Sequence, residues 1–303
     1  MFKKINRAYQ AGGLRLVAAK TVDYTKNKFC FLFLRSLPLI FYRWLSVDNR
    51  LVKKIQSNLM LLDLTDEGIN CELAATGVHE KESTAQIKKE VKPGMIVLEL
   101  GANVGYYALI EAKLVGPTGK IIAIEPSPIN LQLLHTNVLL NDLEDRFEFH
   151  HKAIGNKNSR EKFYVSNRGN LSSFIKRDEG KFIHSIKEID VEMQTLDSFL
   201  CERKIDYLRM DIEGFEWEAL EGMQNLLSSS RAPRGMYIEV HSELLNHNGH
   251  SAKAFLEKLQ EFGYDISRSF YRGRADISCA SMQELLSHPR VEAGYWETFF
   301  IKK

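Results

Sequence analysis

The sequence has few cysteines, and no two of them have the spacing of metal ligands. Cys30, Cys71, Cys201 and Cys279 are scattered along the 303 residues. This distribution gives no sign of a zinc site, and a disulfide framework is not expected in a chain of this length. We therefore expect a protein of a reducing compartment, the cytoplasm.

A hydrophobic run long enough to cross a bilayer is also lacking. The most apolar stretch, residues 29–45, is interrupted by Arg35, Pro38 and Arg43, and it is shorter than the roughly 20 residues of a spanning helix. We expect no signal peptide, because the basic start is not followed by an apolar core and a cleavage site. Packing against the body of the protein is the first interpretation of this stretch. Peripheral contact with a membrane through residues 1–54 is the second.

Acidic residues are almost missing from the first part of the chain. Up to Lys54 the sequence has twelve Lys and Arg residues but only two acidic residues, Asp23 and Asp48, so this part carries a net charge of +10. The whole chain carries +2. The remainder is therefore acidic, with a net charge of −8. A basic segment ahead of an acidic body favours contact with an anionic surface. The overall balance gives no hint of a dedicated nucleic-acid binder.

From residue 58 onward, short apolar runs alternate with helix-like stretches. Strands are predicted over residues 59–64, 95–100, 120–124, 147–153, 205–210, 237–240, 264–266 and 298–301, and helices over 83–90, 106–114, 128–140, 216–227 and 252–262. Residues 155–190 are polar and are predicted to form a loop with a hairpin around 163–165. The alternation is typical of a Rossmann-like α/β fold with a mostly parallel, seven-stranded sheet and helices on both faces. We divide the chain into a basic, helical N-terminal extension, residues 1–57, and an α/β domain, residues 58–303.

A glycine turn follows one of the buried strands. Residues 97–105 read VLELGANVG, so a strand runs into Gly101 and a helix opens after Gly105. Gly101 allows a sharp turn, and Gly105 allows a ligand or a helix to approach the backbone closely. The N–H groups at the start of the helix are suited to an anionic or polar ligand. The spacing departs from the GxGxxG fingerprint of dinucleotide-binding proteins, which argues against NAD.

An acidic residue follows the next strand. Glu125, in the string Glu125-Pro126-Ser127, lies about twenty residues beyond the glycine turn, the interval expected for a carboxylate that binds a ribose. A carboxylate at this place can accept hydrogen bonds from both ribose hydroxyls. A solvated loop residue or a helix cap is the alternative, and the glycine turn ahead of Glu125 favours the ribose.

Together with later strings, these motifs resemble the FkbM-type methyltransferases. The resemblance is carried by VLELGANVGYYAL, IAIEPSPINLQLLHTNVLLND, KAIGN, TLDSF, IDYLRMDIEGFEWEALEGM and YIEVH, and it extends from residue 66 to about residue 264. It implies a class I methyltransferase fold, S-adenosylmethionine as the methyl donor, and usually O-methylation of a sugar, polyketide or other small hydroxyl compound. We therefore expect an O-methyltransferase with a small-molecule or glycan hydroxyl as acceptor and no nucleic-acid partner.

The resemblance also implies which residues contact the cofactor. Its methionine part would lie against the glycine turn and its ribose against Glu125. The adenine would lie near Ala153 and Lys152, and the transferable methyl group beside Asp211. The expected contacts are Glu99, Gly101, Ala102, Asn103, Gly105, Tyr106, Glu125, Pro126, Ala153 and Asp211.

Three ionisable residues, Asp211, Glu239 and His241, are the candidates for catalysis. Asp211 ends one predicted strand, and Glu239 and His241 end the next, on the same side of it by alternation. Methyl transfer needs alignment and removal of the acceptor's proton. His241 is the preferred general base because it titrates near neutrality. Helix capping is the alternative for Asp211 and Glu213. A metal site of the three candidates is chemically feasible, but no local ligand spacing supports it, and no metal is assigned.

Two other functions stay open on the sequence. One is a protein that binds S-adenosylmethionine without transferring its methyl group, and the other is a nucleotide-dependent enzyme on a similar sheet. The intact glycine turn and ribose carboxylate argue against a protein that has lost catalysis. The chain departs from the family pattern at Glu99, where members often have aspartate, and at Arg209, where they often have lysine. Arginine keeps the charge but differs in size and geometry.

Overall fold

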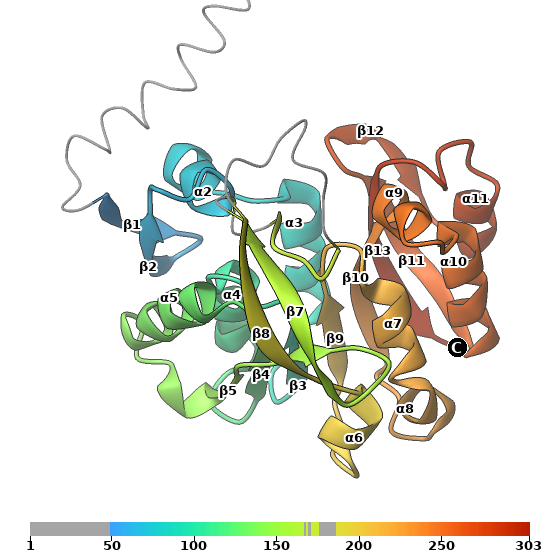
Figure 1. Ribbon diagram of the computed structural model, residues 1–303, viewed down its shortest axis with the longest axis horizontal. Coiled ribbons are helices and arrows are strands. Elements are labelled where there is room, and N and C mark those ends of the chain that lie inside the picture. The colour runs from blue at the N-terminus through green and yellow to red at the C-terminus, as the bar shows by residue number, and fades with distance from the viewer. Residues whose placement is uncertain (1–48, 167, 169–170, 176–185) are drawn as a thin grey trace, which may run out of the picture.

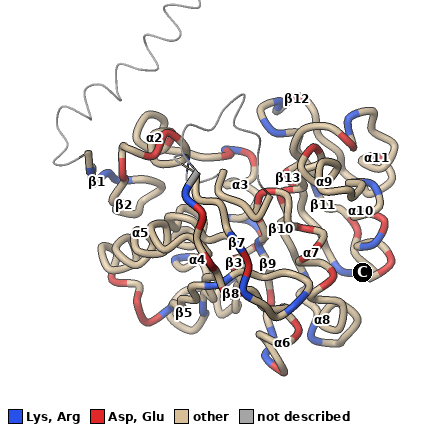
Figure 2. The backbone as a smooth tube through the Cα atoms, in the orientation of Figure 1, with Lys and Arg blue, Asp and Glu red and all other residues tan. Residues whose placement is uncertain are grey.

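The computed structural model describes residues 49–166, 168, 171–175 and 186–303 (Figure 1). Most of the expected N-terminal extension, and with it the expected helical structure and membrane contact, lies outside these residues. Among the described helices, none has the length and the apolar character that crossing a bilayer requires. Charges of both signs are interspersed along the described chain (Figure 2).

A sheet of eight strands forms the centre of the molecule. Its strands are β3 (Ile96–Leu100), β4 (Lys120–Ile124), β5 (Phe147–His150), β9 (Tyr207–Met210), β10 (Gly235–His241), β11 (Tyr264–Tyr271), β12 (Arg274–Cys279) and β13 (Tyr295–Lys302). They lie in the order β12-β11-β13-β10-β9-β3-β4-β5. Strands β5, β4, β3, β9 and β10 run parallel, whereas β13 is antiparallel to β10 and β11, and β12 is antiparallel to β11. The predicted α/β class and mostly parallel sheet are confirmed. The sheet has eight strands and not the seven predicted, and β12 is the added strand that the pattern did not predict.

Helices cover both faces of this sheet. One face carries α2 (Ile69–Thr76), α3 (Lys81–Glu90), α4 (Tyr106–Val115) and α5 (Pro128–Leu139); the other carries α6 (Leu196–Leu200), α7 (Glu216–Glu221), α8 (Gln224–Ser228), α9 (Ser242–His247), α10 (Ala252–Glu261) and α11 (Met282–Leu286). The strands alternate between two cores, since Val97 packs with α4 whereas Leu98 and Leu100 pack on the opposite face. The order of the strands along the sheet reverses between β3 and β9, because β4 and β5 follow on one side of β3 whereas β9 and β10 lie on the other. Ligands of such folds bind at this point.

A hairpin precedes the α/β body and packs on it. Strand β1 (Arg50–Ile55) pairs with β2 (Asn58–Asp63), and the turn between them has positive φ at Gln56 and Ser57. The side chain of Asn137, on α5, accepts from the backbone N–H of Leu61 at 2.6 Å. The expected boundary between residues 57 and 58 therefore falls inside a paired hairpin.

The prediction of a polar loop over residues 155–190 needs correction. Its two ends form β7 (Ser159–Ser166) and β8 (Ile186–Gln194), which with β6 (Ala153–Ile154) make a three-stranded sheet. The predicted strand 147–153 is accordingly divided between two sheets, β5 in one and β6 in the other. The predicted helix 216–227 is also broken, into α7 and α8, at Gly222. A Cβ atom at Gly222 would lie 2.0 Å from the carbonyl oxygen of Gly155. A 3-10 turn, η1 (Glu144–Arg146), precedes β5.

Candidate functional site

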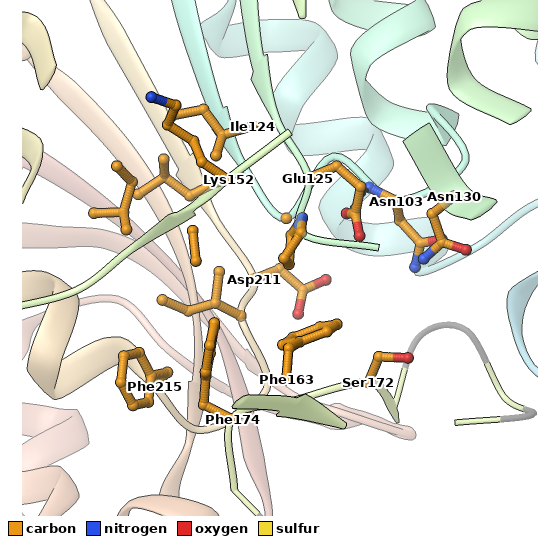
Figure 3. A pocket seen from close by; sticks show the side chains of 16 residues that line it. Asn103, Ile124, Glu125, Asn130, Lys152, Phe163, Ser172, Phe174, Asp211 and Phe215 are labelled. Carbon is orange, nitrogen blue, oxygen red and sulfur yellow. Dashed lines mark hydrogen bonds between the residues drawn. The ribbon is translucent and has the colours of Figure 1, made fainter. Parts of the chain in front are cut away.

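A pocket opens at the carboxyl ends of β3, β4 and β9, where the strand order reverses (Figure 3). The glycine turn and Glu125 form one wall, and Phe163, Phe174 and Phe215 form another, with Asp211 between them. The space between the lining side chains, counted out to the solvent, is about 590 Å³.

The glycine turn brings the end of β3 against the end of β9. Gly101 has φ +83°, and a Cβ atom there would lie 2.1 Å from the carbonyl oxygen of Asp211. A side chain at this position would therefore force the two strand ends apart. Asn103 has φ +50°, and its backbone N–H donates to Glu125 Oε2 at 2.8 Å. The turn is thus fixed by the carboxylate that the sequence assigns to the ribose.

Glu125 is buried on the pocket wall. Its Oε1 accepts from the backbone N–H of Ser127 at 2.9 Å, and its Oε2 accepts from Asn103. Burial raises the pKa of Glu125 to about 7, against the opposing effect of these N–H donors. Each carboxylate oxygen retains a further lone pair, so the side chain can accept hydrogen bonds from a ligand in the pocket.

The expected cofactor contacts divide into three groups. Lining the main pocket are Gly101, Asn103, Glu125, Pro126, Ala153 and Asp211, with Lys152 beside them. Ala102 and Tyr106 line a smaller, adjoining cleft that shares Gly101, Asn103 and Asp211 with the pocket. Gly105 packs toward the side chain of Leu134, and Glu99 is fully buried in the sheet. Neither of these last two residues lines the pocket, so the structure does not support their expected contact with the cofactor.

Three phenylalanines on the pocket wall were missed from the sequence. The ring centroid of Phe174 lies 4.9 Å from that of Phe163 and 4.9 Å from that of Phe215. Phe163 and Phe174 belong to the segment predicted as a polar loop. The presence of these aromatic residues in so polar a segment could have indicated a packed surface, because aromatic side chains need a surface to pack on.

Arg209 is buried beneath the pocket, where it forms ion pairs with two carboxylates. It donates to Glu99 Oε2 at 3.2 Å and to Asp211 Oδ2 at 3.1 Å. Its guanidinium lies 4.0 Å from the ring centroid of Tyr107, close enough for a cation–π contact. Glu99 thus has a structural partner, and Asp211 is oriented from the side that faces away from solvent.

His241 is surrounded by carboxylates. Its Nδ1 lies 2.8 Å from Glu216 Oε1, and its Nε2 lies 3.6 Å from Glu213 Oε2, 3.8 Å from Glu239 Oε1 and 3.9 Å from Asp211 Oδ1. Burial alone would lower the pKa of His241, but the carboxylates outweigh it and raise the pKa to about 10. A protonated imidazole is a poor acceptor of a substrate's proton. The choice of His241 as general base is therefore not supported.

Glu239 is fully buried and paired with Arg272. Burial raises the pKa of Glu239 well above its usual range. Of the three catalytic candidates, Asp211 is the one that reaches the pocket, with 20% of its side chain exposed. It also lines the adjoining cleft, together with Glu213, Arg209 and Arg272.

The model of the methyltransferase FkbM domain matches residues 99–266. Methyltransferase sdnD of Sordaria araneosa is 23% identical over 208 residues, covering 57% of this chain and 74% of its own length. Ribosomal RNA large subunit methyltransferase E of Bdellovibrio bacteriovorus is 33% identical over 72 residues, 24% of this chain. The present chain spans 37% of the length of that relative. Because a ribosomal RNA methyltransferase is among the relatives, the comparisons do not support the expected absence of a nucleic-acid partner.

Two solved structures show similarity at a low level. Fibrillarin of Aeropyrum pernix, in complex with natively bound S-adenosyl-L-methionine, has a TM-score of 0.41 and 14% identity, and the similarity covers 73% of this chain and 74% of that one. The S-adenosylmethionine-dependent O-methyltransferase of Thermotoga maritima has a TM-score of 0.40 and 16% identity, over 74% of this chain and 66% of that one.

Proposed function

Because the chain belongs to the FkbM family of methyltransferases, whose domain model matches residues 99–266, we propose that it transfers a methyl group to a hydroxyl oxygen of a sugar, glycan or other small molecule. S-adenosylmethionine is the cofactor of this chemistry. The observation that carries the proposal is the pocket between the glycine turn and Phe174, with Glu125 on its wall and Asp211 at the entrance to a second cleft.

The cofactor would lie along this pocket. Its ribose hydroxyls would donate to Glu125, whose two oxygens are held by backbone N–H groups on the far side. The adenine would lie between Ala153 and the rings of Phe163 and Phe174, and the sulfonium would lie near Asp211. The protein aligns the methyl group for an in-line displacement.

The acceptor would occupy the adjoining cleft. This cleft shares Asp211 with the cofactor pocket. Its lining includes several polar and charged residues, which are His79, Arg209, Glu213 and Arg272, beside apolar ones such as Ile69 and Ala102. Such a lining suits an acceptor with several hydroxyl groups, because each hydroxyl both donates and accepts a hydrogen bond. Asp211 and Glu213 are the carboxylates placed to orient the reacting hydroxyl.

The cofactor assignment is tested by titration calorimetry on the full chain with S-adenosylmethionine, its demethylated product, and NAD. We expect micromolar binding of the first two, no binding of NAD, and at least about tenfold weaker binding in Glu125→Ala, since each lost hydrogen bond to a charged group costs about 1.5–3 kcal/mol. Glu144→Ala, an exposed carboxylate in η1, is the control and should bind as wild type does. No binding of S-adenosylmethionine by the wild type would overturn the proposal.

The acceptor class is tested by transfer of a labelled methyl group to a panel of compounds. The panel should hold sugars, phenols, amines and a structured RNA, and the product should be identified by its carbon–oxygen or carbon–nitrogen bond. We expect label in hydroxyl compounds. Label confined to the amines or to the RNA would refute O-methylation of a small molecule, and cofactor binding without any transfer would favour a non-catalytic binding protein.

A further inference from the structure

Three possible metal ligands meet at the ends of two neighbouring strands. One ligand atom from each of Asp211, Glu239 and His241 lies within 4.8 Å of the other two. Asp211 follows β9, whereas Glu239 and His241 are two residues apart on β10 and point to the same side of it. The two β10 residues are fully buried, and Asp211 opens to the pocket. The set offers two carboxylates and one imidazole around a common point.

Two of the residues in this cluster carry a buried polar atom without a hydrogen bond. Among the described residues, neither His241 Nε2 nor Glu239 Oε2 has a hydrogen-bond partner. An unsatisfied buried polar atom costs about 1–3 kcal/mol and is rare in folded proteins. His241 Nδ1 is held by Glu216 at 2.8 Å, so the ring is oriented with Nε2 directed into the cluster. A carboxylate on the second ring nitrogen is the arrangement that metal-ligating histidines usually show.

The separations fit ligands of one ion better than they fit hydrogen bonds. His241 Nε2 lies 3.8 Å from Glu239 Oε1 and 3.9 Å from Asp211 Oδ1, beyond hydrogen-bonding distance. Two ligand atoms that are each about 2.1 Å from one ion lie about 3 to 4.2 Å apart, depending on the angle between them. The cluster therefore needs little rearrangement to coordinate a cation.

The local charge favours a cation as well. Four carboxylates, those of Asp211, Glu213, Glu216 and Glu239, lie within 4 Å of the His241 ring nitrogens. Arg209 contacts Asp211 through its Oδ2, the oxygen that is not the one nearest to His241. Arg272 contacts Glu239 through Oε1, the oxygen that also lies 3.8 Å from His241 Nε2, whereas Glu239 Oε2 has no hydrogen-bond partner among the described residues. Divalent cations are held in proteins by such groups of carboxylates.

We propose that Asp211, Glu239 and His241 bind one divalent transition-metal ion, of the Mn²⁺ or Zn²⁺ type, beside the acceptor cleft. The imidazole favours such ions over Mg²⁺ and Ca²⁺, which prefer oxygen ligands alone. Only the neutral ring coordinates an ion, so metal binding would displace the proton that the surrounding carboxylates favour on His241. With three protein ligands, the ion keeps open positions toward the cleft that Asp211 lines.

The role of the ion rests on the proposed O-methylation. An acceptor hydroxyl bound to the ion loses its proton to solvent more readily, because the cation stabilises the alkoxide. The oxygen then forms a bond to the methyl carbon, the carbon–sulfur bond breaks, and its electron pair stays on sulfur, which becomes a neutral thioether. No redox change takes place.

The test is metal binding by the full chain after treatment with a chelator, measured calorimetrically with MnCl₂, ZnCl₂ and MgCl₂ in the absence of cofactor. We expect one ion per chain and tighter binding of Mn²⁺ or Zn²⁺ than of Mg²⁺. His241→Gln and Asp211→Asn should each weaken binding by at least about tenfold, the smaller end of the effect seen when groups supporting a metal are removed. Asp211 is partly exposed, so its variant tests the site even where the His241 variant does not fold.

His250→Gln is the matched control. The His250 ring also faces a carboxylate, Glu218 at 3.5 Å, but it lines neither the pocket nor the adjoining cleft. Its replacement should leave metal binding unchanged. Absence of binding by the wild type, or equal binding in the Asp211 and His250 variants, would overturn the metal site. A chain that binds S-adenosylmethionine but no metal would refute this inference alone, and one that binds metal but no cofactor would refute the proposed function.

Discussion

The guanidinium of Arg209 donates to the Asp211 carboxylate at 3.1 Å from the buried side of the pocket. The two residues are two positions apart at the end of β9, so their side chains project from the same face. Arg209 is itself fixed by Glu99 at 3.2 Å and by the ring of Tyr107. A cation that solvent hardly reaches thus orients the carboxylate that lines both the pocket and the adjoining cleft.

Replacing Arg209 by lysine should therefore disturb both stability and catalysis. Lysine keeps the charge, but a single ammonium group cannot bridge two carboxylates and lie flat on an aromatic ring. We expect Arg209→Lys to lower the free energy of unfolding by about 1–3 kcal/mol. We also expect kcat to fall more than the affinity for S-adenosylmethionine does, because Asp211 loses its orientation.

Arg203→Lys is the control for this prediction. Arg203 also contacts a carboxylate through two nitrogens, Glu148 at 2.9 and 2.8 Å, but this pair is largely exposed. Exposed ion pairs contribute about 0–1 kcal/mol, so its loss should be small. Urea denaturation of both variants gives the comparison. Equal losses in the two would mean that the burial of Arg209 adds nothing.

Gly101 is needed both for the close approach of β3 and β9 and for its own left-handed backbone conformation, and the energetic costs of the two can be measured separately. Gly101 has φ +83°, and Gly263, after α10, has φ +84°. A Cβ atom at Gly101 would lie 2.1 Å from the carbonyl oxygen of Asp211, whereas a Cβ atom at Gly263 would have no described atom within 4 Å. The cost of the left-handed conformation, about 1–2 kcal/mol, is common to both. Gly101→Ala should cost about 1–3 kcal/mol more, as overpacking does.

The two glycine substitutions should also differ in their effect on cofactor binding. Gly101→Ala moves the turn on which Asn103 and Glu125 are joined, so the affinity for S-adenosylmethionine should fall. Gly263→Ala lies at the end of a remote helix and should leave the affinity at the wild-type value. Denaturation and calorimetry on the two variants measure both effects. A Gly101 variant that binds the cofactor normally would show that the strand ends can separate without harm to the pocket.

The sequence predicted the central sheet well because buried parallel strands carry a strong local signal. MIVLEL and KIIAI are apolar on both faces, and the turn after each strand is marked by Gly101 or by Glu125-Pro126. The small sheet was missed because SREKFYVS and IKEIDVEMQ bury one face only and expose charged residues on the other. Pairing between segments so far apart is decided by tertiary packing, which no local pattern records.

The site was predicted in the same uneven way. Gly101, Asn103 and Glu125 were predicted correctly to lie on the pocket wall, because each follows a buried strand and the interval between the glycine turn and Glu125 is the expected one. The surroundings of His241 were not predictable, since Glu216 comes from a helix whose orientation depends on the packed sheet. A histidine that looked suited to accept a proton is therefore one whose pKa its neighbours raise to about 10. The contacts of a titratable group, and not its type, decide its charge.

The aromatic wall of the pocket should contribute to binding of the cofactor's adenine. Phe174 is half-buried and contacts the rings of Phe163 and Phe215. Stacking of a base on an aromatic side chain contributes about 1–3 kcal/mol, so Phe174→Ala should weaken binding of S-adenosylmethionine by that amount. Phe262→Ala, a half-buried ring at the end of α10, is the control. If calorimetry shows the same affinity in both variants, the adenine does not lie on this wall.

The ionisation of Glu125 should make cofactor binding depend on pH. Burial raises its pKa to about 7 from the 4.5 of a free side chain. Between these values the folded protein therefore holds more protons than the unfolded chain does, and this residue's contribution to stability falls as the pH rises through that range. Ribose hydroxyls donate more strongly to a carboxylate than to a neutral carboxyl group. Affinity for S-adenosylmethionine should accordingly increase from pH 6 to pH 8.

Glu125→Gln separates this effect from other titrating groups. The amide is close in size to the carboxyl group but does not ionise, so its affinity should be lower at pH 8 and nearly independent of pH in this range. Wild type should release a proton on binding near pH 6.5, which appears as a dependence of the calorimetric heat on the ionisation enthalpy of the buffer. A wild-type affinity that is flat across this range, or a Gln variant with the same slope, would show that the ribose does not bind through an ionised Glu125. In that case the hydrogen bonds from Asn103 and Ser127 would give this carboxylate the structural role of shaping the glycine turn.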